Sequence, residues 1–268
     1  MNTAWLFDVD GVLTSPEEKR VTQPDIFIQL IQRLEKGDLV GLNTGRAIDF
    51  MITQILDTLE KKISNKSLLR SIYAIGEKGT TWITYDEKGI RKIDIDSKIN
   101  IPIEIQNQIR KIVSQPPYSD TMFYDKTKKT MISLEMKNGS PFADFKTSQT
   151  KLIQVLQNIL NENQKNENIE IDMFRICTDV QNKNVGKALG ARKFVELLTK
   201  DGHSPDKYIC FADDTSDYEM LTELKRLGKN AELIFVGEKE KLEGLDLTSV
   251  IFTEELLDKG TLEYLQNN

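Results

Sequence analysis

Two carboxylates at the end of an apolar run are the residues of this chain best placed to do chemistry. Asp8 and Asp10 follow Leu6 and Phe7, and Gly11 comes directly after them. Successive side chains of a strand point to opposite faces, so residues two apart share a side and both carboxylates address one small volume. Two anions this close repel each other, and either a bound cation or a shared proton removes the repulsion; a hard divalent cation such as magnesium suits a site that also holds phosphate. A hydrated surface turn is the alternative interpretation.

Polar residues that suit a phosphate group follow the next apolar run, residues 39–42. Asn43, Thr44, Gly45 and Arg46 combine a hydroxyl with main-chain amides beside a glycine, and a predicted helix begins just after them. A helix N-terminus attracts anions, so Thr44 and Gly45 are candidates to hold a phosphate oxygen. A threonine that only caps the helix is the alternative.

A third polar segment follows the apolar run at residues 208–211. It places three carboxylates, Asp213, Asp214 and Asp217, within five residues. Magnesium shared with Asp8 would supply the counter-charge that this concentration of anions requires. Acidic residues also stabilise the first turn of a helix, which accounts for Asp217 but poorly for a pair that emerges directly from a strand.

Two lysines lie near the start of a later predicted helix, at Lys183 and Lys187. A lysine is unfavourable at the positive end of a helix dipole, so its presence there indicates an anion nearby. A solvated surface lysine is the alternative, and it must hold for at least one of the two.

The predicted elements bring these groups to one edge of one sheet. Strands and helices alternate in the first 76 residues and again after residue 184, which is typical of βαβ units and a parallel sheet. In such a sheet ligands bind at the carboxyl ends of the strands, where the strand order reverses. We therefore predict an α/β fold with a doubly wound, mainly parallel sheet. Its strands are expected at residues 3–7, 39–42, 72–75, 208–211, 232–236 and 250–252, and its helices at 23–36, 47–61, 216–227 and 254–265, with one more that ends at 199.

Residues 80–184 follow a different pattern. Two alternating runs, 81–85 and 90–95, flank a short polar turn and predict an antiparallel hairpin. Further strands are expected at 121–124, 130–136 and 169–177, with a helix at 150–161. The chain is thus predicted to fold as a core domain, residues 1–79 and 185–268, that is interrupted by an inserted α+β domain, residues 80–184.

Composition narrows the classes of function. The 268 residues include 36 Lys and Arg against 42 Asp and Glu, a net charge of −6, and the lysines are scattered among acids, which argues against a nucleic-acid partner. No apolar run approaches the length of a membrane span, so we expect a cytoplasmic protein without a membrane partner. His203 is the only histidine, which excludes histidine triads and multi-histidine metal sites.

Taken in order, the four polar segments resemble the motifs of the haloacid dehalogenase superfamily of aspartate-nucleophile phosphotransferases. Asp8-Val9-Asp10-Gly11 is similar to the first motif, Thr44-Gly45-Arg46 to the second, a lysine near residue 187 to the third, and Asp213 to Asp217 to the fourth. An insertion between the second and third motifs resembles the cap of the sugar-phosphatase branch. The fourth motif is most similar to that of trehalose-phosphate and sucrose-phosphate phosphatases.

The resemblance implies a magnesium-dependent phosphatase that acts on a small phosphorylated molecule, with a sugar phosphate as the expected substrate. It implies that Asp8 is the nucleophile and Asp10 the acid and base. Magnesium would be bound by Asp8, Asp213 and the main-chain carbonyl of Asp10. Thr44, with Gly45, and Lys187, with Lys183 in reserve, would hold the phosphate. Asp214, Asp217 and Arg46 would support these groups.

Three positions depart from the family pattern. Val12 replaces the threonine usual after Asp-Gly, Lys78 replaces an asparagine frequent where the chain enters the cap, and Val185 stands where the third-motif lysine is expected. Two alternatives remain open at this point. A phosphomutase of the same superfamily would use the same acids but return the phosphoryl group to sugar, and a non-catalytic regulator with this fold would be expected to lose an essential acid.

Overall fold

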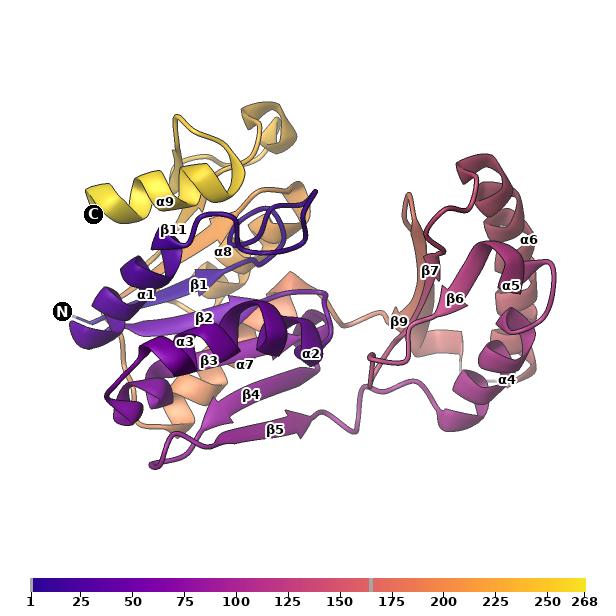
Figure 1. Ribbon diagram of the computed structural model, residues 1–268, viewed down its shortest axis with the longest axis horizontal. Helices are drawn as coiled ribbons and strands as arrows, with labels where there is room; N and C mark the ends of the chain where they lie inside the picture. The colour runs from indigo at the N-terminus through magenta and orange to yellow at the C-terminus, as the bar shows by residue number, and fades with distance from the viewer. Residues whose placement is uncertain (1, 164–165) are drawn as a thin grey trace. The chain divides into compact units, whose positions relative to one another are not determined.

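The computed structural model describes residues 2–163 and 166–268, which form two compact units (Figure 1). The first unit comprises Met1–Asp94 and Gly186–Asn268, and the second comprises Ile95–Val185. Within the described residues, no helix combines the length and the apolar character that a membrane span requires.

An eight-stranded sheet forms the centre of the first unit, in the order β12-β11-β10-β1-β2-β3-β4-β5. The pairs from β12 to β3 are parallel, and β4 runs antiparallel to β3. This arrangement confirms the predicted α/β fold with a mainly parallel sheet. The strands are β1 (Thr3–Phe7), β2 (Leu39–Asn43), β3 (Ile72–Gly76), β4 (Thr81–Tyr85), β5 (Arg91–Ile95), β10 (Lys207–Ala212), β11 (Ala231–Phe235) and β12 (Val250–Phe252).

Helices cover both faces of this sheet, as the near-continuous apolar strands require. Phe7 belongs to one buried cluster, together with residues of the helices that follow β1 and β2, whereas its neighbour Leu6 belongs to the cluster on the opposite face. The helices are α1 (Asp25–Glu35), α2 (Ile48–Met51), α3 (Asp57–Lys62), α7 (Lys187–Lys200), α8 (Tyr218–Arg226) and α9 (Leu257–Asn267). A π-helical turn, Ile52–Leu56, joins α2 to α3, so the helix predicted at 47–61 is one continuous helical segment.

The second unit has its own antiparallel sheet, in the order β6-β7-β9-β8, and its own apolar core. Helix α6 begins eight residues before the predicted start at 150, and the strand predicted at 169–177 already ends at Met173. The elements α4, α5 and β9 were not predicted. The elements are α4 (Ile103–Val113), α5 (Tyr118–Thr121), β6 (Met122–Tyr124), β7 (Ile132–Met136), α6 (Phe142–Glu162), β8 (Ile169–Met173) and β9 (Cys177–Asn182).

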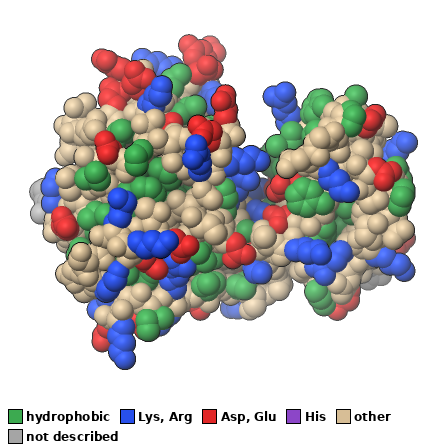
Figure 2. Space-filling model, viewed as in Figure 1, with side chains coloured by type: hydrophobic (Ala, Val, Ile, Leu, Met, Phe, Trp, Pro, Cys, Tyr) green, Lys and Arg blue, Asp and Glu red, His purple; other side chains and the backbone are tan. Residues whose placement is uncertain are grey.

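The hairpin of β4 and β5 extends the sheet of the first unit, whereas the sequence placed it in the inserted domain. The pairing of Ile75 with Trp82 joins β4 to β3, and Ile83 and Tyr85 are buried in the core of the first unit. The boundary between the units therefore falls between Asp94 and Ile95 instead of near residue 80. Charged side chains of both signs are mixed over the face of this unit that Figure 2 shows.

Candidate active site

The candidate site lies where the strand order of the sheet reverses. From β1 the chain continues through β2 and β3 on one side, and the later strands β10, β11 and β12 lie on the other. The main-chain N–H of Asp8 donates to the carbonyl of Phe211 at 3.0 Å, which ties the end of β1 to the end of β10. The carboxyl ends of these two strands therefore present their acids to the same volume.

Three carboxylates meet at this point. One oxygen from each of Asp8, Asp213 and Asp217 lies within 4.8 Å of the others, and Asp8 and Asp217 are buried. All three come from the segments that the sequence singled out. The carboxylate of Asp217, expected to have a supporting position, belongs to this group, whereas that of Asp10 does not.

Lys187, the first residue of α7, places its ammonium group among these acids. Its Nζ atom donates to the carboxylate of Asp8, lies 2.7 Å from Oδ1 of Asp217 and donates to the main-chain carbonyl of Asn43 at 2.9 Å. Lys183, the reserve candidate, is exposed and lies in the second unit. The structure therefore brings Lys187 to the candidate nucleophile.

Burial and mutual repulsion shape the ionisation of the cluster. Burial raises the pKa of Asp8 well above its usual value, although Lys187 opposes this effect. Burial, followed by the charge of Asp217, raises the pKa of Asp213 to about 7. Burial alone would lower the pKa of Lys187, but the charges of Asp8 and Asp217 outweigh it and raise that pKa. One ammonium group thus incompletely balances three acids.

Gly11 allows Asp213 to approach the first motif. Its φ of +80° is one that residues with a side chain rarely adopt, and a Cβ atom there would lie 2.3 Å from Oδ2 of Asp213. Only a glycine fits between the end of β1 and this carboxylate.

Arg46 fixes the orientation of Asp10. Its Nε and terminal nitrogen donate to the Asp10 carboxylate at distances from 2.8 to 3.1 Å, a two-pronged contact. The face of the guanidinium also lies over the ring of Phe50 at 5.0 Å. Arg46, from the polar segment after β2, thus holds Asp10, from the polar segment after β1.

Thr44 is buried at the end of β2, and main-chain bonds connect it to the start of α7. Its N–H donates to the carbonyl of Ile75 and its hydroxyl accepts from the N–H of Arg46, both at 3.0 Å. The carbonyl of Thr44 accepts from the N–H of Lys78, whose own carbonyl accepts from the N–H of Gly186. The main-chain amide of Thr44 is therefore already used within the fold, and its hydroxyl oxygen accepts one hydrogen bond.

Asp214 points away from the three acids. Its Oδ2 contacts Nζ of Lys241 at 3.1 Å, and its Oδ1 accepts from the N–H of Ser216 at 3.4 Å, as a cap of the short helix Thr215–Asp217. Asp214 therefore supports the loop, and its contact with the acids is indirect, through the main chain.

Sequence reasoning missed the roles of Asn43 and Lys241. The side-chain amide of Asn43 donates to the main-chain carbonyl of Lys187 at 3.0 Å, and the main-chain carbonyl of Asn43 accepts from the ammonium group of Lys187. Asn43 therefore contacts the lysine at both its main chain and its ammonium group. Lys241 donates to the main-chain carbonyl of Asp213 at 2.9 Å. Asn43 stands within the noted second segment, but a contact through its main-chain carbonyl leaves no signal in the residue type.

The donor set suits a magnesium ion. Hard divalent cations prefer carboxylate oxygens, and the buried Asp8 and the partly buried Asp213 have raised pKa values that an additional positive charge would lower. The acids that are brought together therefore fit the ion that the resemblance implies.

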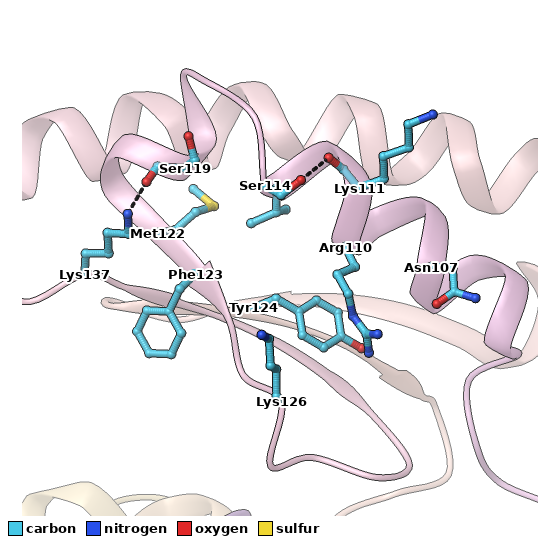
Figure 3. Close-up of a pocket in the computed structure, with 11 residues that line it drawn as sticks. Asn107, Arg110, Lys111, Ser114, Ser119, Met122, Phe123, Tyr124, Lys126 and Lys137 are labelled. Carbon is cyan, nitrogen blue, oxygen red and sulfur yellow. Dashed lines mark hydrogen bonds between the residues drawn. The ribbon is translucent and has the colours of Figure 1, made fainter.

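The second unit contains a separate hollow of about 540 Å³ beside α4 and β6 (Figure 3). Arg110 lies over the ring of Tyr124 at 4.7 Å, and Lys137 donates to the carbonyl of Ser119. Its described lining includes four cationic side chains and no carboxylate, so it lacks a group of acids such as the one in the first unit. These cations are Arg110, Lys111, Lys126 and Lys137.

We predict that Gly11→Ala lowers the free energy of unfolding by more than the strain of its backbone conformation alone explains. Gly37 provides a matched control, because its φ is +89° and a Cβ atom there meets nothing within 4 Å. Gly37→Ala should cost about 1–2 kcal/mol of unfolding free energy through backbone strain alone. Gly11→Ala should cost more in urea denaturation, because Asp213 must also move. Equal losses in the two variants would contradict the proposed close approach.

Lys78 carries backbone strain that an asparagine would relieve. Its φ and ψ are 58° and 34°, and Glu77 before it also has a positive φ, so both lie in the left-handed region that asparagine tolerates better than lysine. We expect Lys78→Asn to be more stable in thermal unfolding than Lys78→Ala, by up to about 1 kcal/mol. The alanine variant removes the same long side chain and retains the strain. If Lys78→Ala is as stable as Lys78→Asn, backbone strain at position 78 does not explain the difference expected between asparagine and other residues.

No protein-family model and no curated protein sequence match the chain, but solved structures do. A haloacid dehalogenase-like hydrolase from Bacteroides thetaiotaomicron has a TM-score of 0.65 at 12% identity, covering 100% of this chain and 99% of that one. The C-terminal domain of Candida albicans trehalose-6-phosphate phosphatase has a TM-score of 0.64 at 15% identity, covering 99% and 92%. The C-terminal domain of the Candida albicans trehalose synthase regulatory protein has a TM-score of 0.59 at 12% identity, covering 97% and 92%. The chain therefore has the fold of haloacid dehalogenase-like phosphatases.

Proposed function

We propose that this protein is a magnesium-dependent phosphatase that hydrolyses a phosphate monoester, with a sugar phosphate as its substrate. The observation that carries the proposal is the group of Asp8, Asp213 and Asp217 with the ammonium of Lys187 in contact with two of them. The fold of known phosphatases supports the same reaction class.

Asp8 is the nucleophile in this proposal. Its carboxylate oxygen forms a bond to phosphorus, the bond from phosphorus to the ester oxygen breaks, and an aspartyl-phosphate results. Lys187 offsets the repulsion between the incoming phosphate and the carboxylate, and the hydroxyl of Thr44 donates to a phosphoryl oxygen. Because Lys187 is held by both Asp217 and Asn43, its ammonium group is already in position before the substrate binds.

Asp10 transfers the proton in both steps. In the first step it donates a proton to the oxygen that leaves phosphorus. In the second it accepts a proton from the water that attacks phosphorus, the bond to Asp8 breaks, and inorganic phosphate leaves. Arg46 supports this role by fixing the direction in which the Asp10 carboxylate points.

Asp8, Asp213 and the main-chain carbonyl of Asp10 would hold the magnesium ion. When bound, magnesium supplies positive charge that stabilises the anionic groups of the reaction. Asp217 orients Lys187, and Asp214 supports the loop that carries Asp213.

A regulatory role without catalysis is the competing proposal, since one of the similar structures is a domain of a regulatory protein. The retention of Asp8, Asp10 and Asp213 favours an enzyme, because a regulator has no need of a nucleophile, a proton donor and a metal ligand at one site.

We expect the purified protein to release inorganic phosphate from at least one member of a panel of sugar phosphates and other phosphate monoesters. Release should require magnesium and stop with a chelator. Asp8→Asn should lower the rate by at least about three orders of magnitude, because an amide is a poor nucleophile. The proposal is wrong if the wild type releases no phosphate from any ester, or if Asp8→Asn is as active as the wild type. Transfer of phosphate within a hexose phosphate without release would indicate a phosphomutase.

Magnesium binding can be tested without any substrate. Magnesium should raise the melting temperature of the wild type, because a ligand that binds only the native state stabilises it. The rise should be lost in Asp213→Asn and retained in Asp214→Asn, whose carboxylate is directed to Lys241. A rise that persists in Asp213→Asn, measured by scanning fluorimetry over a magnesium titration, would place the ion elsewhere.

A further inference from the structure

The open edge of the eight-stranded sheet carries exposed apolar side chains. Strand β5 is the last strand beyond β4 (Figure 1). Ile90, Ile93 and Ile95 on and beside it are 58%, 53% and 46% exposed. An edge strand with exposed apolar residues and unsatisfied main-chain groups is a template for pairing with another strand.

The direction of the main-chain groups of β5 follows from the hairpin. The N–H of Asp86 donates to the carbonyl of Ile90, and in an antiparallel pair the residues that bond to the partner strand alternate. By this alternation we infer that Lys92 and Asp94 bond to β4, whereas the main-chain groups of Arg91, Ile93 and Ile95 face the open edge. The ion pairs of Arg91 with Asp57 and Glu60 place its side chain on the face of the sheet that carries α3.

The sequence of β5 is complementary to itself when two copies run antiparallel. With Ile93 opposite Ile93 of a second copy, Lys92 faces Asp94 and Asp94 faces Lys92. In this alignment the outward main-chain groups of Ile93 bond to those of Ile93 in the second copy. Those of Arg91 bond to those of Ile95 in the second copy. Opposite charges that face each other across strands are stabilising.

Neighbouring alignments are disfavoured by charge. A pair centred on Lys92 would place two lysines opposite each other, and a pair centred on Asp94 would place two aspartates opposite each other. Like charges directly opposite are destabilising. Charge therefore selects the alignment centred on Ile93 over these neighbours.

We propose that the protein forms a symmetric dimer in which β5 of one copy pairs antiparallel with β5 of the other, so that the two central sheets become continuous. The partner strand is β5 of a second copy of this chain, because β5 carries both the lysine and the aspartate of each charge pair. By symmetry, each Lys92–Asp94 pair occurs twice.

Charge exchange tests the dimer and its alignment together. The oligomeric state is measured by sedimentation velocity over a concentration series for the wild type, Lys92→Asp, Asp94→Lys and the double variant. Each single variant creates two like-charge pairs and should raise the dimer dissociation constant by about tenfold or more. The double variant exchanges the charges and should recover the dimer.

A matched control and the opposing outcomes make the test decisive. Lys151→Asp changes an exposed lysine on α6 and should leave the dimer intact. Circular dichroism verifies that each variant is folded. A wild type that is monomeric at every concentration overturns the proposal. A dimer that tolerates both single changes, or one that the double variant fails to recover, also overturns it. These readouts do not depend on phosphatase activity.

Discussion

The repulsion among three crowded carboxylates, two of them buried and one partly buried, is the constraint on which the candidate site depends. Asp8, Asp213 and Asp217 lie within 4.8 Å of one another, and Lys187 offers one positive charge to the group. Burial strengthens each of these interactions, because charges attract and repel more strongly away from water. Lys187 therefore balances this group only in part, and a divalent cation, as proposed above, would reduce the remaining repulsion among the carboxylates.

The parallel sheet supplies the geometry that such crowding needs. Adjacent strand ends deliver Asp8 and Asp213 from segments about two hundred residues apart, and the bond from Asp8 to Phe211 aligns them. Gly11 then permits an approach that a side chain would block. Lys78, in its left-handed conformation, connects Thr44 to the start of α7 through main-chain hydrogen bonds, although it contributes no acid to the site. The charges and the backbone are therefore parts of one arrangement.

Much of the fold and of the candidate site could be predicted from the sequence because apolar runs that end at polar groups mark strand ends. The runs before Asp8 and Asp213 are buried strands, and their neighbours in the sheet follow from the alternation with helices. The hairpin at 81–95 was assigned to the wrong unit, because alternation identifies a strand but not the sheet that it joins. The burial of Ile83 and Tyr85 in the core of the first unit assigns the hairpin to that unit. This burial depends on contacts with residues that are distant in the sequence.

The lysine shows how a displaced residue can still reach the same acids. The family pattern expects a lysine at the position of Val185, yet Lys187 contacts Asp8 from the first turn of α7. Asn43 holds the main chain of Lys187, and it fits against α7 because Gly190 has no side chain: a Cβ atom there would lie 1.9 Å from Oδ1 of Asn43. The position of the ammonium group is therefore set by how closely β2 and α7 approach. Spacing along the chain does not reveal this distance, which is why the sequence alone left Lys183 as a rival.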